Sequence, residues 1–379
     1  MESITWRQVA ALHMRRQHLL TAAPHTRLVD VVREHVAIQA QVMSSAELSL
    51  RARVRGLRRD DVRDALWQER TLVKTWAMRG TLHLVAASEV PELVRGLGTR
   101  LGWQSAVWLR YFKVTKQEMV ALQDAIGSLL SEDPMTRQEL ADALATKLGD
   151  PAFAERVTSS WGTFLKPAAG RGYLAFGPDR GRNVTFVHPG AWLGIDIPEP
   201  VDDGFDAVLV RHLAAFPGAS KGELARWWGA AASRVTAASK RLGDRLVVVD
   251  LEGTKAWVLA EDVAELLRAE PEPDSTVRLL AGFDPYTLSL QKEAEPLLPL
   301  GRRPLVSRTA GWISAVLLSG GAVAGTWTHE TKPKATTIEL SPWRRLAKGE
   351  RTTLEAEAQA IGEFLAPGVE ARLTISAPT

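Results

Sequence analysis

The chain has 379 residues, of which 24% are charged and 45% apolar, and its formal net charge at pH 7 is +3. This composition is ordinary for a globular protein of two to four modules. The absence of cysteine excludes disulfides, cysteine-held iron–sulfur clusters and thiolate zinc sites. The sequence opens without a signal-peptide core and has no apolar run near the ~20 residues that cross a bilayer, so we expect a cytoplasmic protein with no membrane partner.

The positive charge is unevenly distributed along the chain. Residues 1–80 contain 14 Lys and Arg against 8 Asp and Glu, and residues 299–351 contain 9 against 3. Two basic regions favour an anionic partner such as nucleic acid. Two arginine-rich surfaces in contact with solvent would give the same counts, so charge alone leaves both readings open.

The first part of the chain predicts helices followed by a hairpin. Thr5 is placed to cap the first helix, and apolar residues recur at helical spacing along it. The predicted helices cover residues 6–20, 28–38, 45–55 and 60–69, and the predicted strands cover 71–76 and 81–85. This outline is that of a winged helix, and we assign it to residues 1–115.

The same outline recurs twice, which indicates an array of modules rather than one large core. We assign the second module to residues 116–200 and the third to 201–272. Thr136 and Glu139 are spaced as a capping box. The predicted helices cover residues 116–131, 136 onward, 151–167, 205–216, 220–228 and 231–242, and the predicted strands cover 172–176, 184–187, 245–251 and 255–259.

From residue 273 onward the pattern is mostly that of strands. The predicted strands cover residues 277–281, 314–318, 322–327, 335–340 and 371–375, with one helix over 353–365. A small antiparallel sheet or barrel with a helix alongside fits this order. The sequence therefore predicts a multidomain α+β protein in which three tandem winged helices precede a small β-barrel-like domain at 273–379.

Winged helices bind DNA more often than other partners, but many dock proteins. In the third module the helix at 231–242 offers Arg234, Lys240 and Arg241 to DNA, although a polar surface face would look the same. A non-catalytic DNA-binding transcriptional regulator is therefore one hypothesis for the function.

A pair of glutamines, Gln39 and Gln41, stands in an apolar setting at the predicted end of the second helix. The sequence contains no P-loop, His-Glu-x-x-His or Gly-x-Ser-x-Gly motif and no cluster of metal-binding histidines, so we expect no cofactor. Glutamine does not ionise, but its amide can hold a water molecule. Residues two apart on an ideal helix point ~200° away from each other, so both reach one water only if the helix ends or the segment is extended.

Several stretches together resemble the AlkZ-type DNA glycosylases of a tandem winged-helix superfamily that also contains the YcaQ-type crosslink glycosylases. Gln39-Ala40-Gln41 resembles the Gln-apolar-Gln motif of that family, whereas YcaQ-type relatives carry Asp where Gln41 stands. The other matching stretches are residues 75–84, 283–286 and 320–327. They extend over nearly the whole chain.

The resemblance implies three winged helices and a C-terminal barrel-like domain that together bind double-stranded DNA. It also implies a monofunctional glycosylase that releases N7-alkylated purines, including bulky adducts or interstrand crosslinks, with water positioned by Gln39 and Gln41. A C-terminal hairpin is implied to approach the lesion, and residues 328–334, with His329, Lys332 and Lys334, match it by position.

From this resemblance we expect a cytoplasmic, nucleoid-associated monomer that needs no protein partner. Its role would be DNA repair or self-resistance to a DNA-alkylating natural product. Arg79 and Asp284 lie in matching stretches, but either could be a structural ion-pairing residue, and we assign neither a catalytic role.

Overall fold

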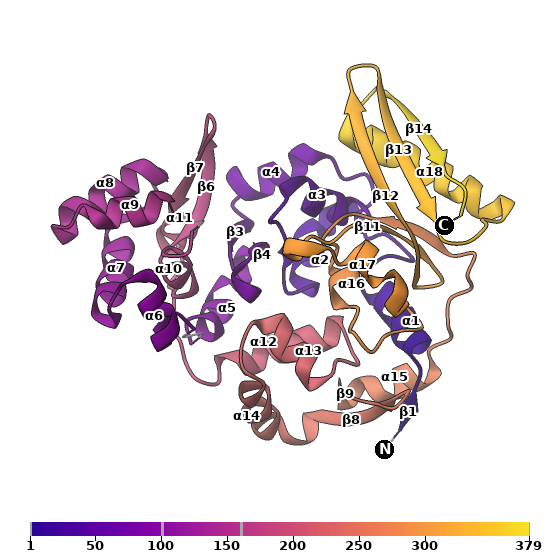
Figure 1. The fold of residues 1–379 in the computed structure, drawn as a ribbon, viewed down its shortest axis with the longest axis horizontal. Helices are drawn as coiled ribbons and strands as arrows, with labels where there is room; N and C mark the ends of the chain where they lie inside the picture. Colours follow the sequence, from indigo (N-terminus) through magenta and orange to yellow (C-terminus); the bar gives the residue numbers. More distant parts are fainter. Residues whose placement is uncertain (1, 100–101, 160–161, 379) are drawn as a thin grey trace. The chain divides into compact units, whose positions relative to one another are not determined.

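The computed structural model describes residues 2–99, 102–159 and 162–378 (Figure 1). The chain forms two compact units, and each combines segments that are distant in the sequence. Unit 1 consists of Met1–Val62, Val210–Glu223 and Leu242–Thr379, and unit 2 consists of Arg63–Leu209 and Leu224–Arg241. The module boundaries near residues 115, 200 and 272 remain predictions.

The N-terminal helices of unit 1 begin where the sequence predicts them. Thr5 caps the first helix, because its side chain accepts a hydrogen bond from the backbone N–H of Gln8. In return, the Gln8 side-chain oxygen accepts a hydrogen bond from the backbone N–H of Thr5. These helices are α1 (Trp6–Arg16), α2 (Leu28–Glu34) and α3 (Met43–Arg51), and α4 (Arg59–Trp67) follows.

A second sheet of unit 1 joins the N-terminus to the hairpin of the predicted third module. Strands β8 (Leu246–Leu251) and β9 (Thr254–Leu259) are antiparallel, and β1 (Ser3–Ile4) pairs with β8 in parallel. Glu252 and Gly253 both adopt positive φ, which gives the tight two-residue turn that matches strand twist. Helix α15 (Val263–Arg268) follows, and α12 (Gly204–Ala215), α13 (Lys221–Trp228) and α14 (Ala232–Leu242) precede the hairpin in the chain.

The C-terminal part of unit 1 is a curled sheet with the strand order β10-β11-β12-β13-β14. Helix α18 (Lys348–Leu365) connects β13 to β14 and lies beside β14 (Figure 1). The last strand is parallel to its neighbour, so the predicted all-antiparallel pairing is wrong at this strand, because a helical crossover returns the chain in the same direction. The strands are β10 (Val277–Leu280), β11 (Ala315–Ser319), β12 (Ala322–Lys332), β13 (Ala335–Pro342) and β14 (Glu370–Ile375).

The core of unit 1 draws on both ends of the chain. Buried residues of α1, such as Leu12 and Met14, belong to the same apolar cluster as Tyr286, Val316 and Leu318. Burial of large side chains in such a cluster stabilises each by about 1.5–3 kcal/mol relative to exposure. The first helix and the C-terminal sheet therefore share one core.

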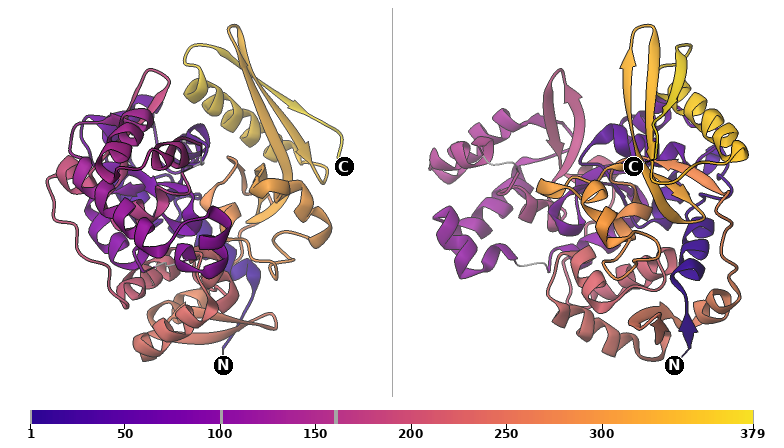
Figure 2. Two further views of the ribbon diagram at one scale, coloured as in Figure 1. Left: turned by 60° about the vertical axis from the view of Figure 1, so that its left-hand side comes forward. Right: turned by 45° about the vertical axis from the view of Figure 1, so that its right-hand side comes forward.

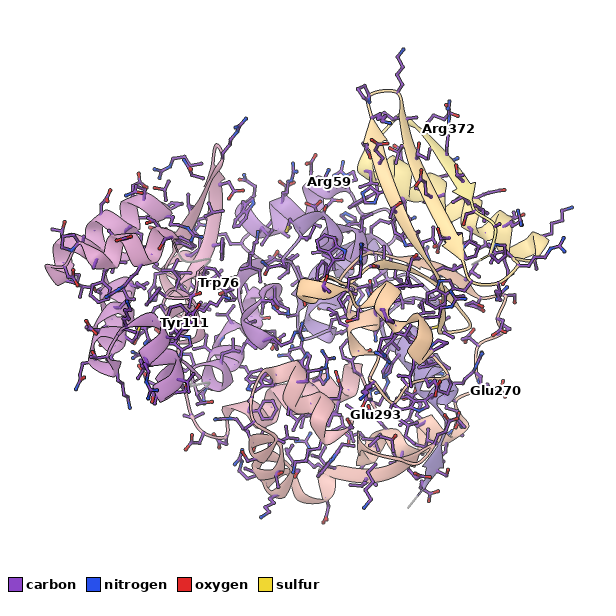
Figure 3. All side chains as sticks on the ribbon, viewed as in Figure 1. Arg59, Trp76, Tyr111, Glu270, Glu293 and Arg372 are labelled. Atoms are coloured by element: carbon purple, nitrogen blue, oxygen red, sulfur yellow. The ribbon has the colours of Figure 1, made fainter. Side chains whose placement is uncertain are left out.

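Unit 2 has its own apolar core, with Trp76 among the residues of that core (Figure 3), and it also contains most of α4 and α14. The predicted helix over 151–167, part of which lies outside the described residues, is two helices. Gly162 adopts φ +81°, and a side chain there would clash with the Trp76 ring at 2.4 Å. The helices are α5 (Val90–Leu97), α6 (Ala106–Phe112), α7 (Lys116–Leu129), α8 (Arg137–Leu148), α9 (Ala152–Ser159), α10 (Lys166–Gly170) and α11 (Pro189–Leu193). The strands are β3 (Leu72–Trp76), β4 (Leu82–Ala86), β5 (Met135–Thr136), β6 (Ala175–Arg180) and β7 (Asn183–Val187).

The element content agrees with the predicted α+β class. Within the described ranges, none of the helices combines the length and the apolar character that a membrane span requires.

Candidate active site

The two glutamines lie in a short non-helical segment between α2 and α3. Helix α2 ends at Glu34, four residues earlier than the sequence predicts, and α3 begins at Met43. Gln39 belongs to the two-residue strand β2 (Ile38–Gln39) and is buried, whereas Gln41 is exposed. Both residues are therefore outside a helix, which is the geometry that two amides need if they are to face one water molecule.

The chain leaves α2 through an unfavourable backbone conformation. Val36 adopts φ +66°, a region that β-branched residues rarely occupy, and its side chain is buried. Its backbone N–H donates to the carbonyl of Arg33 at 3.0 Å. Such conformations cost about 1–3 kcal/mol and persist where the surrounding structure enforces them. The turn directs the following residues into the extended segment that carries Gln39.

His35, beside this turn, is held in a defined tautomer. Its Nδ1–H donates to the Val31 carbonyl at 2.7 Å, and its Nε2 accepts from Arg53 Nε at 3.0 Å. Burial, together with the charge of Arg53, lowers the pKa of His35 from 6.5 to about 3. The imidazole is therefore neutral at pH 7, as acceptance of a hydrogen bond at Nε2 requires.

Arg53 connects the glutamine segment to the C-terminal part of unit 1. Its two terminal nitrogens donate to the two carboxylate oxygens of Asp284, both at 2.7 Å, and both side chains are fully buried. Arg53 also donates to Gln17 Oε1 and to the Ser49 carbonyl. The Asp284 carboxylate further accepts from the Tyr286 backbone N–H at 2.9 Å. Asp284 thus belongs to a buried structural ion pair, the possibility that the sequence left open for it.

A second ion pair links α3 to α4. Glu47 is buried and accepts from Arg59 Nε at 2.8 Å; Arg59, at the start of α4, is labelled in Figure 3. Helix α3 is therefore fixed by Arg53 just past its last turn and by Glu47 within it.

The predicted DNA-contacting hairpin is longer than the sequence indicates. Residues 328–332 continue β12 rather than forming a turn, and His329 pairs in register with Ile338 of β13. Lys332 and Lys334 flank the tip, both exposed, and Lys332 Nζ forms an ion pair with Glu330 at 2.8 Å. Both views of Figure 2 show this hairpin reaching the outer end of its sheet, where β14 pairs with β13 from Ala335 onward. The predicted lysines therefore lie at the tip of the β12–β13 hairpin.

The basic residues predicted on the third module lie in different surroundings. Arg241 forms a two-point ion pair with Asp206 at 2.6 Å, and Arg234 donates to the carbonyl and hydroxyl oxygens of Thr99 and lines a cavity of about 1090 Å³ in unit 2. Lys240 is exposed at the end of α14. Their role in DNA binding stays a prediction.

Sequence reasoning did not anticipate the buried contacts of His35 and Arg53. An isolated Arg or His gives no sign of burial, because both types are mostly found at surfaces or intermediate positions. The apolar residues around the glutamines were the indication in the sequence that this segment is packed against the interior of the protein.

Comparisons with known proteins agree with the whole architecture. Residues 32–364 match the family described as DNA glycosylase AlkZ-like. An interstrand DNA cross-link repair glycosylase from Streptomyces sahachiroi is 37% identical over 331 residues, covering 85% of this chain and 87% of that protein. The solved structure of the Streptomyces sahachiroi DNA glycosylase AlkZ superposes with a TM-score of 0.88 at 33% identity, over 99% of this chain and 100% of the other.

Proposed function

The chain belongs to the AlkZ-like family of DNA glycosylases, and on this basis we propose that it hydrolyses the N-glycosidic bond of N7-alkylated purines with water positioned by Gln39 and Gln41. DNA glycosylases are hydrolases that act on the N-glycosyl bonds of DNA. The alternative of a transcriptional regulator without chemistry is therefore set aside.

The observation that carries the proposal is the non-helical segment between α2 and α3. Two glutamines on opposite faces of a helix could not share one water molecule. In this chain α2 ends at Glu34, and the left-handed turn at Val36 precedes the extended segment. His35, which directly precedes Val36, is held by its hydrogen bonds to the Val31 carbonyl and from Arg53, and these contacts stabilise the turn. The segment is thus pre-organised, which is what water positioning demands.

Two neutral amides suffice because the substrate activates its own leaving group. Alkylation at N7 gives the purine a positive charge, and the base departs with the electron pair of the glycosidic bond as a neutral molecule. The sugar passes through an oxocarbenium-like state, and water adds its oxygen to the anomeric carbon and releases a proton to solvent. An amide oxygen accepts from the water and an amide NH2 donates to it, so both groups fix its position without removing a proton beforehand.

The proposed substrates include bulky N7 adducts and interstrand crosslinks. The Streptomyces sahachiroi relative is described as an interstrand cross-link repair glycosylase. Purine N7 faces the major groove, and a base tied to the opposite strand cannot be turned out of the duplex as many glycosylases require. General repair and self-resistance to a DNA-alkylating natural product would both use this activity.

The β12–β13 hairpin is the proposed DNA-contacting arm. Lys332 and Lys334 would contact phosphates, and His329 lies further down the same strand. We further propose that the protein acts as a monomer without a protein partner.

The test uses a duplex with a single N7-methylguanine and enzyme in excess, followed by alkali to cut abasic sites. We expect Gln39→Ala and Gln41→Ala each to lower the single-turnover rate by about 100-fold, the usual consequence of losing a positioning group. Gln138→Ala is the matched control, because Gln138 is an exposed glutamine whose side-chain amide donates to Asp142 on α8. Undiminished release by both active-segment variants would sink the assignment. Adducts of increasing bulk in the same assay then define the substrate range.

A further inference from the structure

An exposed tryptophan stands on a closed loop of unit 1. Trp312 is 47% exposed, and among the tryptophans that the structure describes it is the only one with this degree of exposure. Ser307 and Ile313 pair across the loop, the Arg308 backbone N–H donates to the Trp312 carbonyl at 2.8 Å, and Ser314 N–H donates to Val306. Exposure of a large aromatic ring to water is energetically unfavourable. The backbone hydrogen bonds that close the loop hold the ring in this exposed position.

The indole rests on a second aromatic ring that is itself anchored. Phe283 meets Trp312 edge to face, with ring centroids 5.1 Å apart and planes at 75°. Phe283 is buried and adopts φ +60°, an unfavourable conformation that its neighbours enforce. The next residue is Asp284, whose carboxylate is fixed by Arg53. The backbone that carries Phe283 is therefore held in place by the adjacent buried ion pair of Arg53 and Asp284.

The same segment touches the start of α3, directly after the glutamines. A methyl group at Gly282 would lie 2.8 Å from the Ile313 carbonyl oxygen and 3.7 Å from Ser45 Oγ. Ser45 belongs to the first turn of α3, which begins two residues after Gln41. Residues 282–284 thus follow α3 from Ser45 at its first turn to Arg53 just beyond its end. Trp312 therefore packs on Phe283, in a segment that lies beside α3, the helix that follows Gln41.

We propose that Trp312 is a substrate-binding residue that stacks on the N7-alkylated, positively charged purine base. The inference rests on the proposed function. A π face attracts a cation within about 6 Å of its centroid, and Trp is the strongest of the aromatic residues in this respect. Arg308 is exposed on the same loop, and within the described residues its side chain has no ion pair or hydrogen bond. The guanidinium group of Arg308 can therefore bind a DNA phosphate beside the lesion.

The positive charge of the base also determines which kinetic constant depends on Trp312. The positive charge is on the base before bond cleavage and has moved to the sugar at the transition state. The indole therefore stabilises the bound substrate more than the transition state, so its removal weakens binding and does not lower the rate of bond cleavage from the bound complex.

The experiment compares two duplexes of the same shape but different charge. One carries N7-methylguanine on a 2′-fluorinated sugar, which slows release, and the other carries neutral 7-methyl-7-deazaguanine. We expect Trp312→Leu to weaken binding of the charged duplex by about tenfold and of the neutral duplex by about threefold or less. Trp312→Phe, which keeps a π face, should restore most of the lost affinity. The single-turnover rate on the ordinary N7-methylguanine duplex at saturating enzyme should not fall and should rise by no more than about tenfold, because the lost interaction is weaker in the transition state than in the bound substrate.

Leu305 provides the matched control, because it is also 47% exposed and lies on the same stretch of chain. Leu305→Ala should leave both affinities unchanged. Equal losses on the charged and neutral duplexes, or an equal loss in Leu305→Ala, would overturn the assignment while base release by the unsubstituted protein continued. Absence of base release by the unsubstituted protein would instead contradict the proposed function, so the two failures are distinguishable.

Discussion

The buried pair of Arg53 and Asp284 is the clearest residue-scale target. Both side chains have no solvent exposure, so removal of one charge leaves the other without compensation in a medium of low polarity. We expect Asp284→Asn to lower the free energy of unfolding by about 3–5 kcal/mol, measured by urea denaturation at pH 7.

The control for this change is an exposed ion pair. Glu370 pairs with Arg372 on β14, where both side chains are mostly exposed (Figure 3), and Glu370→Gln should leave the urea midpoint unchanged. The double variant Arg53→Met with Asp284→Leu should recover part of the loss, because it removes both charges. An Asp284→Asn midpoint equal to that of the unsubstituted protein would show that the pair does not hold residues 282–284 against α3.

Two buried histidines predict how stability depends on pH. Burial lowers the pKa of His13 to about 4 and, together with the charge of Arg53, that of His35 to about 3. The unfolded chain has histidine pKa values near 6.5, so below that pH the unfolded state binds protons that the folded state does not. Stability is therefore fully present above pH 6.5 and declines as pH falls toward 4, by up to about 1.4 kcal/mol per pH unit for each histidine.

Urea denaturation from pH 7.5 to 4.5 measures this slope. His13 donates from Nε2 to the Pro217 carbonyl at 2.9 Å, and His13→Gln keeps a donor while removing the titration. This variant should show a shallower slope than the unsubstituted protein over the same range. A slope that does not change would mean that other groups govern the acid sensitivity.

At the scale of elements, the β12–β13 hairpin predicts a salt-dependent contribution to DNA affinity. Each lysine that neutralises a phosphate steepens the dependence of log K on log salt by about 0.9 on duplex DNA. We expect Lys334→Gln to lower affinity for duplex DNA and to reduce that slope by about one. Lys332→Gln should have a smaller effect, because Lys332 already pairs with Glu330.

Fluorescence anisotropy between 50 and 200 mM salt checks both variants. Lys255→Gln is the control, since Lys255 is an exposed lysine near the tip of another hairpin, β8–β9. An equal change of slope in all three variants would mean that the lysines act through net charge rather than through the hairpin.

The elements show what local patterns can and cannot predict. The helix cap at Thr5 and the capping box of Thr136 and Glu139 were predictable because each depends on residues close in sequence. The extension of β12 through residues 328–332 was missed, since polar residues there pair with β13 without being buried. The direction of β14 depends on a crossover, which strand patterns alone do not reveal.

Some features of the candidate site were likewise predictable from the sequence, and others were not. The Gln39 and Gln41 pair was visible as a motif, and the requirement that the helix end before it followed from helix geometry. The left-handed conformation of Val36 was not predictable, because nothing in a Val signals positive φ. Trp312 was not singled out, since its contact with Phe283 and the position of Gly282 beside Ser45 of α3 join residues that are distant in the sequence.

At the scale of the whole molecule, the shared core of unit 1 bears on how the chain folds. Residues of α1 and of the C-terminal sheet belong to one buried cluster, although more than 250 residues separate them. A domain expected to fold alone needs its own apolar core, and the predicted C-terminal domain at 273–379 contributes only part of this one.

We therefore expect a fragment of residues 273–379 to lack a cooperative unfolding transition. Without α1, the side chains of Tyr286, Val316 and Leu318 lose much of their burial, and each loss costs about 1.5–3 kcal/mol, a sum that rivals the 5–15 kcal/mol stability of a typical domain. Near-UV circular dichroism and thermal melts of the fragment, compared with the full chain, measure this directly. A fragment that melts cooperatively above 45 °C would show that the C-terminal sheet is independent of α1, and that the core it shares with the N-terminus adds little to its stability.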